Sequence, residues 1–425
     1  MFRWRWRWGL VVLGWALVAL LAPVWILSGG LGDLLPAPTA SPSPAASPTV
    51  PPSATASPAA RTTPYRAVWV SYLEWQQLDF SSAATFTQDA GALLDNIAAV
   101  GATVVLAQVR PFGDALYPSE LFPFSHLCTG TQGQDPGYDP LALLVQAAHD
   151  RGLELEAWVN PYRLQVGGVP ALCDESPARQ HPEWCKVTTQ GIYLDPGDPA
   201  VRQFIADGVE ELCQNYDLDG IHFDDYFYPT TDASFDAADY AAADSGLSLE
   251  DWRRQNVNDL MTLCHSVTQR YGVRFGVAPL ADLDLCYSGQ YSDAARWLAQ
   301  GGFVDYLMPQ LYWGMTYQQN GDTTRSLPEL AAQWAALPRA EGVALYGGLG
   351  AYRLGDGDGS TAGADEWNTG HALTDQLALL DTLDFQGAGL YRYGSLWANP
   401  PWESLAAQER QAVARYWGVT ASPGY

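Results

Sequence analysis

Basic residues are scarce in this chain of 425 residues. It has 22 Lys and Arg against 47 Asp and Glu, which gives a formal net charge of −25, and its only lysine is Lys186. A protein this acidic repels the phosphate backbone of nucleic acids. The composition therefore argues against nucleic acid as a partner.

Several common catalytic and metal-binding motifs are also missing. The six cysteines show no CxxC spacing, and the chain contains no H-E-x-x-H. It has no G-x-S-x-G before a helix and no glycine-rich phosphate turn after the first expected strand. We therefore predict no metal and no cofactor. If the protein is exported, its cysteines can form disulfides, and Cys173 and Cys185 are the expected pair because they lie in one loop-like stretch.

The N-terminus combines a basic segment with a long apolar run. Arg3, Arg5 and Arg7 lie in residues 1–8, and Gly9 to Leu27 then runs for 19 residues without a charge. This run is long enough to cross a bilayer, and the arginines before it predict that residues 1–8 are cytoplasmic. The alternative for residues 9–30 is a cleaved signal peptide, although its apolar region is usually shorter, about 7–15 residues. We predict a protein outside the cytoplasm, tethered to the membrane, or secreted if the segment is cleaved.

Residues 31–64 have the composition of a linker. They are dominated by Pro, Ser, Thr and Ala and have few large apolar residues. Such a segment cannot bury a core and favours extended conformations. The prediction is a disordered stalk that holds residues 65–425 away from the membrane.

Residues 65–425 alternate between short β-rich runs and amphipathic stretches. This alternation is typical of parallel strands joined by helices, and eight such units predict an α/β fold, a single (β/α)8 TIM barrel. The alternative is an open doubly wound sheet. The expected strands are 67–72, 103–109, 154–160, 220–223, 274–279, 305–311, 344–348 and 387–391, and the expected helices are 85–100, 140–151, 199–215, 249–271, 291–300, 327–337, 370–382 and 402–416.

The fourth expected strand ends in two adjacent carboxylates. Asp224 and Asp225 follow Gly220–Phe223, and Pro229 then prevents further strand pairing. Neighbouring carboxylates tend to acquire different pKa values, so that one can act as an acid while the other stays ionised. Because side chains alternate along a strand, Asp224 shares a face with His222 and Tyr226, and Asp225 reaches that face only if the chain turns. This pair is the predicted catalytic centre.

The other expected strands also end in polar and aromatic residues, where a barrel places its active site. The long segments 110–139 and 161–198 follow two of these strands and are expected to form binding loops. Two alternatives stay open: His222 as a satisfied interior histidine, and Arg110 with Asp114 as an ion pair that braces a loop. The predicted substrate-binding residues are Arg110, Asp114, Trp158, Asn160, Tyr162, Arg163, His222, Tyr226, Gln310, Tyr312 and Trp313.

Eight stretches of the sequence together form a recognisable family pattern, in the correct order: 66–70, 108–119, 129–163, 181–184, 193–196, 219–229, 251–254 and 309–313. This pattern resembles that of the glycosyl hydrolase-like 10 family of bacterial exported barrel proteins. The resemblance implies a glycosidase that acts on bacterial cell-wall (peptidoglycan-type) glycan or a related polysaccharide, with Asp224 and Asp225 at its centre. Glu156 is a departure, since many relatives carry histidine there.

Two mechanisms fit a glycosidase with this centre. In the first, one aspartate works with a distant carboxylate, for which Glu74, Asp114 and Glu156 are the candidates. In the second, the adjacent pair resembles that of substrate-assisted N-acetylhexosaminidases, in which one aspartate orients the acetamido group of the substrate as nucleophile while its neighbour is the general acid. We favour Asp225 as the acid and Asp224 as the orienting group, and the reverse assignment stays open. A rival interpretation is a catalytically inactive barrel that binds glycan through its aromatic residues.

Overall fold

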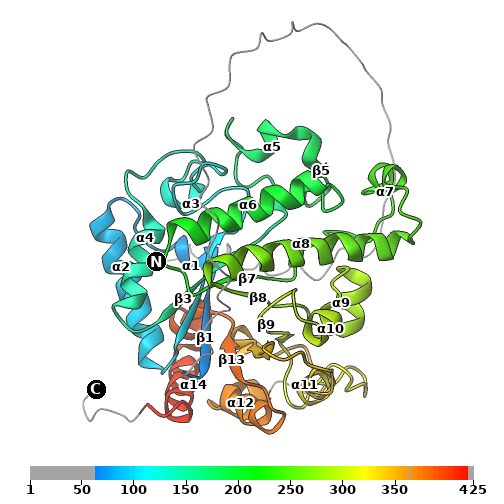
Figure 1. The fold of residues 1–425 in the computed structure, drawn as a ribbon. Coiled ribbons are helices and arrows are strands. Elements are labelled where there is room, and N and C mark those ends of the chain that lie inside the picture. Colours follow the sequence, from blue (N-terminus) through cyan, green and yellow to red (C-terminus); the bar gives the residue numbers. More distant parts are fainter. Residues whose placement is uncertain (1–62, 363–364, 420–425) are drawn as a thin grey trace, which may run out of the picture. The chain divides into compact units, whose positions relative to one another are not determined.

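The computed structural model describes residues 63–362 and 365–419 (Figure 1). The predicted cytoplasmic segment, anchor and nearly all of the linker lie outside these residues and stay predictions. Within the described ranges, none of the helices has the length and apolar character needed to cross a membrane.

The centre of the fold is a curled parallel sheet of ten strand segments, consistent with the predicted barrel. Its order is β10-β12-β13-β1-β2-β3-β7-β8-β9-β11. The segments β9 and β10 belong to one expected strand, and β11 pairs with β9 while β12 pairs with β10. Because β12 also pairs with β13, and β13 with β1, the pairing leads back to the first strand. The segments are β1 (Tyr65–Val70), β2 (Val104–Arg110), β3 (Glu154–Val159), β7 (Gly220–Phe223), β8 (Arg274–Val277), β9 (Tyr306–Leu307), β10 (Gln310–Leu311), β11 (Ala344–Leu345), β12 (Gly347–Leu349) and β13 (Gly387–Leu390).

The connecting helices begin and end close to the expected positions, and their caps explain why. Asp139 and Asp198 each accept a backbone hydrogen bond at a helix start that has proline in its first turn. Gly272 ends the longest helix with a φ of 71°. The helices between strands are α2 (Ala83–Ala99), α4 (Pro140–His149), α6 (Pro199–Asn215), α8 (Leu249–Tyr271), α10 (Ala294–Ala299), α11 (Leu327–Ala335), α12 (Ala372–Thr382) and α14 (Glu403–Tyr416), and α6 packs beside α8 (Figure 1).

Shorter helices occupy the loops. The α-helical ones are α1 (Tyr72–Trp75), α3 (His126–Thr129), α5 (Pro177–Gln180), α7 (Ala237–Ala243), α9 (Leu283–Gly289) and α13 (Tyr393–Trp397). The 3-10 segments are η2 (Pro182–Trp184), η3 (Ala351–Arg353), η4 (Asp365–Asn368) and η5 (Pro400–Trp402).

Two hydrophobic clusters lie on opposite faces of the curled sheet. The inner cluster includes Trp69, Trp158 and Tyr306. The outer and larger cluster lies between the strands and the surrounding helices, and Val68 and Val105 belong to it. A strand side chain therefore either faces the interior of the sheet or packs under a helix, and this choice decides which predicted residues reach the site.

The segment after β3 contains structure that the sequence does not predict. A small antiparallel sheet forms there in the order β4 (Arg163–Val166), β6 (Gly191–Leu194) and β5 (Cys185–Val187). The predicted disulfide is absent, since Cys173 and Cys185 are both free. Cys173 lies close to Gly133 in the preceding long loop, whereas the Cys185 thiol donates to the carbonyl oxygen of His181. The two thiols therefore have separate local partners, and the expected pair is wrong.

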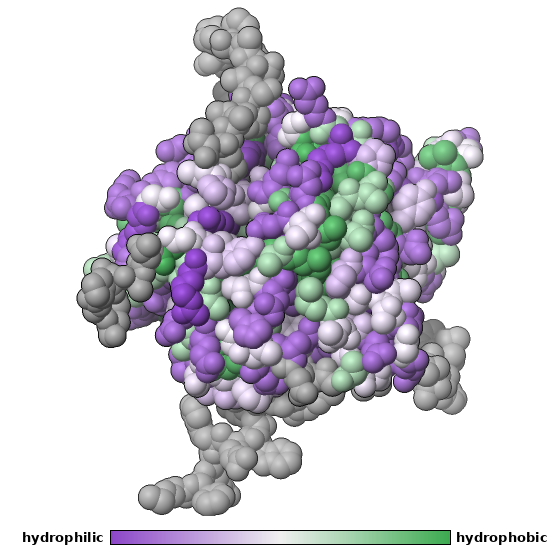
Figure 2. Space-filling model, turned by 90° about the horizontal axis from the view of Figure 1, so that it is seen from below, coloured by the Kyte–Doolittle hydropathy of each residue, from purple (hydrophilic) through white to green (hydrophobic). Residues whose placement is uncertain are grey.

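The surface in Figure 2 is mainly hydrophilic. On this face the most extended group of hydrophobic residues forms a green streak near the centre, and smaller green patches lie apart from it among hydrophilic residues. This distribution fits a chain rich in Asp and Glu.

Candidate active site

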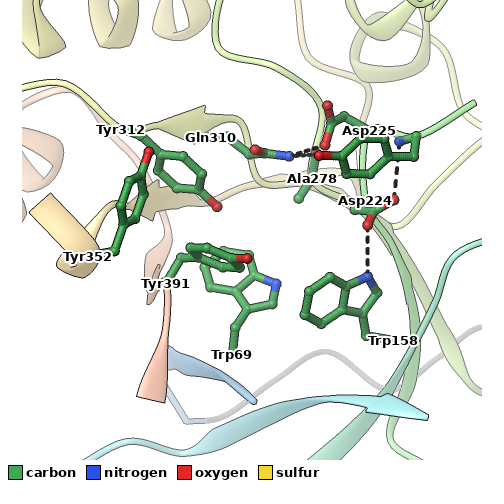
Figure 3. A pocket seen from close by; sticks show the side chains of 10 residues that line it. Trp69, Trp158, Asp224, Asp225, Ala278, Gln310, Tyr312, Tyr352 and Tyr391 are labelled. Atoms are coloured by element: carbon green, nitrogen blue, oxygen red, sulfur yellow. Dashed lines mark hydrogen bonds between the residues drawn. The ribbon is translucent and has the colours of Figure 1, made fainter. Parts of the chain in front are cut away.

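A cavity of about 220 Å³ opens among the carboxyl ends of the parallel strands. The two adjacent aspartates lie on one side of it and a group of aromatic rings on the other (Figure 3). This is the end of a barrel at which active sites occur. The lining residues are Trp69, Trp158, Asp224, Asp225, Tyr226, Ala278, Gln310, Tyr312, Tyr352 and Tyr391.

Three N–H groups hold the Asp224 carboxylate. Its Oδ2 accepts from Trp158 Nε1 at 3.2 Å (Figure 3) and also from Asn160 Nδ2, and its Oδ1 accepts from the backbone N–H of Tyr226 at 3.1 Å. Gln108 fixes the Asn160 amide, because Gln108 Nε2 donates to Asn160 Oδ1 at 2.6 Å. Asp224 is thus held rigidly as an acceptor.

The Asp225 side chain also faces the cavity, because the chain leaves the extended conformation after Phe223. Its Oδ1 accepts from Gln310 Nε2 at 2.7 Å, and its Oδ2 accepts from Gln290 Nε2 at 2.7 Å. Both carboxylates are almost fully buried, with 5% of Asp224 and 6% of Asp225 exposed. The structure therefore brings the predicted pair together in one pocket.

Burial raises the pKa values of both carboxyl groups, which makes them weaker acids than they are in water. Desolvation, followed by repulsion from Asp225, raises the pKa of Asp224 to about 7. Desolvation also raises the pKa of Asp225, although the amide groups of Gln290 and Gln310 oppose that rise. Near neutral pH the pair can therefore keep one proton, as general acid catalysis requires.

Aromatic rings form the wall opposite the carboxylates. Tyr312 stacks on Tyr391, with ring centroids 5.4 Å apart, and Tyr352 meets Tyr312 edge-on at 5.6 Å. Trp69 meets Tyr391 edge-on at 5.9 Å. Flat apolar faces of this kind suit the apolar faces of sugar rings.

Some predicted substrate-binding residues lie outside the pocket, and Arg110 shows the reason most clearly. The register between β2 and β3 shifts between Gln108 and Arg110, so these two residues no longer share a face. The Arg110 guanidinium lies over the Phe122 ring at 4.2 Å, and a Cβ at Gly208 of α6 would come within 2.4 Å of it. Arg110 therefore packs between the sheet and a helix.

Three further predicted residues do not line the cavity. The Asp114 carboxylate is buried in the loop after β2, 3.0 Å from His126 Nδ1 and 3.2 Å from Gln132 Nε2. It therefore braces the loop, but with these partners rather than with Arg110. Tyr162 and Trp313 pack in or against the outer hydrophobic cluster.

Two predicted residues lie next to the pocket. The Arg163 guanidinium lies 5.5 Å from the centre of the Tyr226 ring and donates through Nε to the carbonyl oxygen of Pro111 at 2.8 Å. Its positive charge lowers the pKa of both aspartates, although burial dominates. His222 lies inside the barrel beneath Trp69 and is fully buried.

The candidate distant carboxylates are occupied elsewhere. Glu156 lies deep in the barrel, where it accepts from Tyr306 and Arg274. Glu74 accepts from the Ser71 backbone N–H at 2.8 Å, from the Gly394 N–H at 3.0 Å and from Arg392. Neither lines the cavity.

We expect Glu74→Gln to lower stability without slowing catalysis. The substitution leaves the Arg392 guanidinium without its anionic partner, which should cost about 2–4 kcal/mol of unfolding free energy. Urea denaturation measures this cost, with Asp95→Asn at the partly exposed Arg151 pair as the control, expected to lose less than about 1 kcal/mol. A large fall in kcat with unchanged stability would contradict the structural role of Glu74.

The sequence reasoning missed several lining residues. Trp69 lies inside the first expected strand and Tyr391 at the end of the last, so the alternation of side chains along the first strand and the position of Tyr391 could have identified them. Gln290 follows the short helix α9, and no motif marks it. Within the described residues, no three His, Cys, Asp or Glu side chains form a group suited to a metal ion.

The curled parallel sheet, with paired buried carboxylates at the carboxyl ends of its strands, is consistent with the architecture of the barrel glycosidases. The chain belongs to the Glycosyl hydrolase-like 10 family, whose family model matches residues 64–363. This confirms the family that the motifs predict.

Curated relatives support the same assignment. The chain is 34% identical over 316 residues to Glycosyl hydrolase YngK of Bacillus subtilis (strain 168), an alignment that covers 68% of this chain and 61% of YngK. It is 33% identical over 332 residues to Glycosyl hydrolase DigH of Escherichia coli (strain K12), with 69% of this chain and 74% of DigH covered. The chain thus spans less than two thirds of the length of YngK.

Among solved structures, the chain is similar to the glycoside hydrolase domain of PgaB (BpsB) from Bordetella bronchiseptica. The TM-score is 0.52 at 17% identity, and the match covers 83% of this chain and 99% of that domain. Alpha-L-fucosidase isoenzyme 2 from Paenibacillus thiaminolyticus gives a TM-score of 0.54 at 14% identity over 83% of this chain and 49% of the fucosidase. These two similarities concern the fold alone.

Proposed function

We propose that this protein hydrolyses glycosidic bonds in N-acetylated cell-wall glycan of the peptidoglycan type. The observation that carries the proposal is the pair of adjacent buried carboxylates facing aromatic rings across one pocket. The membrane anchor and linker predicted for residues 1–64 would place this activity outside the cytoplasm, where such glycan lies.

The arrangement favours the substrate-assisted mechanism. A two-carboxylate mechanism needs a second group across the scissile bond, about 5–9.5 Å from the first. Glu74, Asp114 and Glu156 do not line the cavity, so they are not available for this role. The substrate's own acetamido group can replace the missing nucleophile.

Each aspartate then has a distinct part. The pair shares one proton, and in the reactive form that proton lies on Asp225, which gives it to the leaving oxygen while the acetamido carbonyl oxygen attacks C1 and the glycosidic bond breaks. Ionised Asp224, held by three N–H groups, faces the acetamido N–H and stabilises the positive charge that develops on it. Water then adds to C1 with Asp225 as the base, which restores the acetamido group and the acid.

The test is product release from purified glycan strands before and after chemical removal of their acetyl groups. We expect cleavage of the N-acetylated strands and a loss of at least about a hundredfold in kcat/KM on the deacetylated ones, since the nucleophile is gone. Undiminished cleavage after deacetylation would contradict substrate assistance.

Two other outcomes would replace the proposal. Binding of the glycan without any product release would favour the inactive binding barrel. Cleavage of a different polysaccharide, with the cell-wall strands untouched, would favour a polysaccharide hydrolase of another specificity.

A further inference from the structure

A polar chain runs through the interior of the barrel, directly beneath the pocket. We call Trp69, His222, Tyr306, Glu156 and Arg274 the floor network. Trp69 Nε1 lies 3.3 Å from His222 Nε2, His222 Nδ1 lies 2.8 Å from Tyr306 Oη, and Tyr306 Oη lies 2.5 Å from Glu156 Oε2. Arg274 closes the chain, with Nη2 3.1 Å from Glu156 Oε1.

The chemistry of the end groups fixes every proton along this chain. An indole N–H can only donate, so His222 Nε2 must accept. Burial lowers the pKa of His222 to about 3, so the ring is neutral and its single proton lies on Nδ1. That proton goes to the Tyr306 oxygen, and the Tyr306 hydroxyl proton goes to Glu156.

Burial raises the pKa of Glu156, and the charge of Arg274 together with the hydrogen bonds from Tyr306 and Arg274 opposes that rise. Both oxygens of Glu156 accept, one from Tyr306 and one from Arg274, which fits the ionised carboxylate. Arg274 also pairs with Glu154. The donors from Trp69 through His222 to Tyr306 therefore all point the same way, from the pocket towards Glu156, which Arg274 meets from the other side.

The sheet makes room for the network at two glycines. A Cβ at Gly276 of β8 would lie 1.9 Å from the Tyr306 ring, and one at Gly220 of β7 would lie 2.7 Å from the Glu156 side chain. Any other residue at these positions would displace a member of the network. Tyr306 and Glu156 are therefore built into the inner face of the barrel.

We propose that the other members of the floor network hold the Trp69 indole in place as the floor of the pocket. His222, Tyr306 and Glu156 are then positioning residues rather than substrate-binding or catalytic ones. The Trp69 ring lines the cavity while its N–H points down to His222. That Trp69 contacts a sugar rests on the proposed function. The arrangement of protons in the network does not depend on the proposed function. It also gives Glu156 a role different from that of a second acid.

Tyr65 supplies a matched control for the network. Its hydroxyl donates to the same Tyr306 oxygen at 3.2 Å, but it is a branch and lies outside the path from Trp69 to Glu156. Tyr65→Phe therefore removes one buried hydrogen bond to Tyr306 and leaves the path unbroken. Tyr306→Phe breaks the path at its centre.

The first experiment is nuclear magnetic resonance of the ring nitrogens in protein carrying ¹⁵N-labelled His and Trp. The signals of His222 and Trp69 are assigned by their loss in His222→Asn and Trp69→Phe. We expect His222 to be protonated on Nδ1 and not on Nε2, without titration between pH 5 and pH 8. The Trp69 indole N–H signal should shift in Tyr306→Phe and stay in place in Tyr65→Phe. An Nε2-protonated ring, or an unmoved Trp69 signal in Tyr306→Phe, would overturn the proposal even if no glycan is cleaved.

The second experiment measures kcat/KM on N-acetylated glycan strands. Trp69→Phe and Tyr306→Phe should each lose about tenfold, and the double variant should lose about the same tenfold because both act through one indole N–H. Tyr65→Phe should stay within about twofold. Losses that multiply to about a hundredfold, or equal losses in Tyr65→Phe and Tyr306→Phe, would contradict positioning through Trp69. Absence of any cleavage by the unchanged protein would instead contradict the proposed function.

Discussion

Asp225→Asn is expected to lower kcat on N-acetylated glycan by about 10²–10⁴-fold, the contribution that a positioned general acid makes. Asparagine keeps the shape of the side chain and can still interact with Gln290 and Gln310, but it cannot give a proton to the leaving oxygen. Substrate binding should therefore change little. Initial rates and binding of the same strands, measured for both proteins, check this result.

Asp224→Asn should lose at least as much activity for a different reason. The amide cannot supply the negative charge that stabilises the developing positive charge on the acetamido group. An aryl glycoside with an acidic leaving group separates the two roles, because such a leaving group needs no proton. Asp225→Asn should recover most of its activity on that substrate, and Asp224→Asn should not.

A matched substitution outside the pocket is Asp282→Asn. Asp282 accepts from the Leu285 N–H at the start of α9 and does not line the cavity. Its kcat should stay within about threefold of the unchanged protein, as expected for a residue that caps a helix and pairs with Arg325 outside the pocket. Recovery of Asp224→Asn by the activated substrate, with no recovery of Asp225→Asn, would reverse the two assignments.

Much of this fold can be predicted from the sequence because each strand and helix carries its own local pattern. The helices 199–215 and 249–271 coincide with α6 and α8, since an N-cap residue marks each start and the apolar period continues to each end. The expected strands 305–311 and 344–348 are each interrupted in the structure. Such interruptions depend on pairing with neighbouring strands, which a local pattern does not contain.

The site is less predictable than the fold, because a short sequence motif does not show which way each side chain points. Asp224 and Asp225 could be found from two carboxylates at a strand end. Arg110 could not be placed, because one register shift between β2 and β3 turns it away from the interior. Gln290 contacts Asp225 although it lies 65 positions later in the sequence, and only the tertiary fold creates this contact.

Neutral hydrogen-bond donors surround the two adjacent carboxylates and hold them in place. Five side-chain or backbone N–H groups contact the pair, and four come from strands or loops distant in sequence. The arrangement keeps both groups oriented but does not cancel their mutual repulsion with a contacting cation. The raised pKa values of both aspartates follow from this arrangement, and activity and stability should both decrease as the pH rises.

Activity should fall as the pH rises through about 7. The pair must hold one proton for catalysis, and burial raises the pKa of Asp224 to about 7 and that of Asp225 above its usual range. Because two coupled groups share the titration, the falling limb belongs to the pair as a whole. The profile of kcat/KM from pH 4 to pH 9 should fall about tenfold per unit on its alkaline side, and a profile that stays flat to pH 9 would contradict a shared proton.

The same titration should lower the free energy of unfolding of the unchanged protein at high pH, so that Asp224→Asn becomes the more stable of the two proteins there. Between about pH 4 and pH 7 the folded protein keeps a proton on the pair that the unfolded chain has lost, so the free energy of unfolding decreases as the pH rises. Asp224→Asn removes this penalty and should be more stable than the unchanged protein by about 2–4 kcal/mol at pH 8, with a much smaller difference at pH 4. Urea denaturation of both proteins at the two pH values measures the change. A difference that does not vary with pH would mean that the Asp224 carboxylate ionises as easily in the folded pocket as in water, and the proposed acid–base pair would then lose its physical basis.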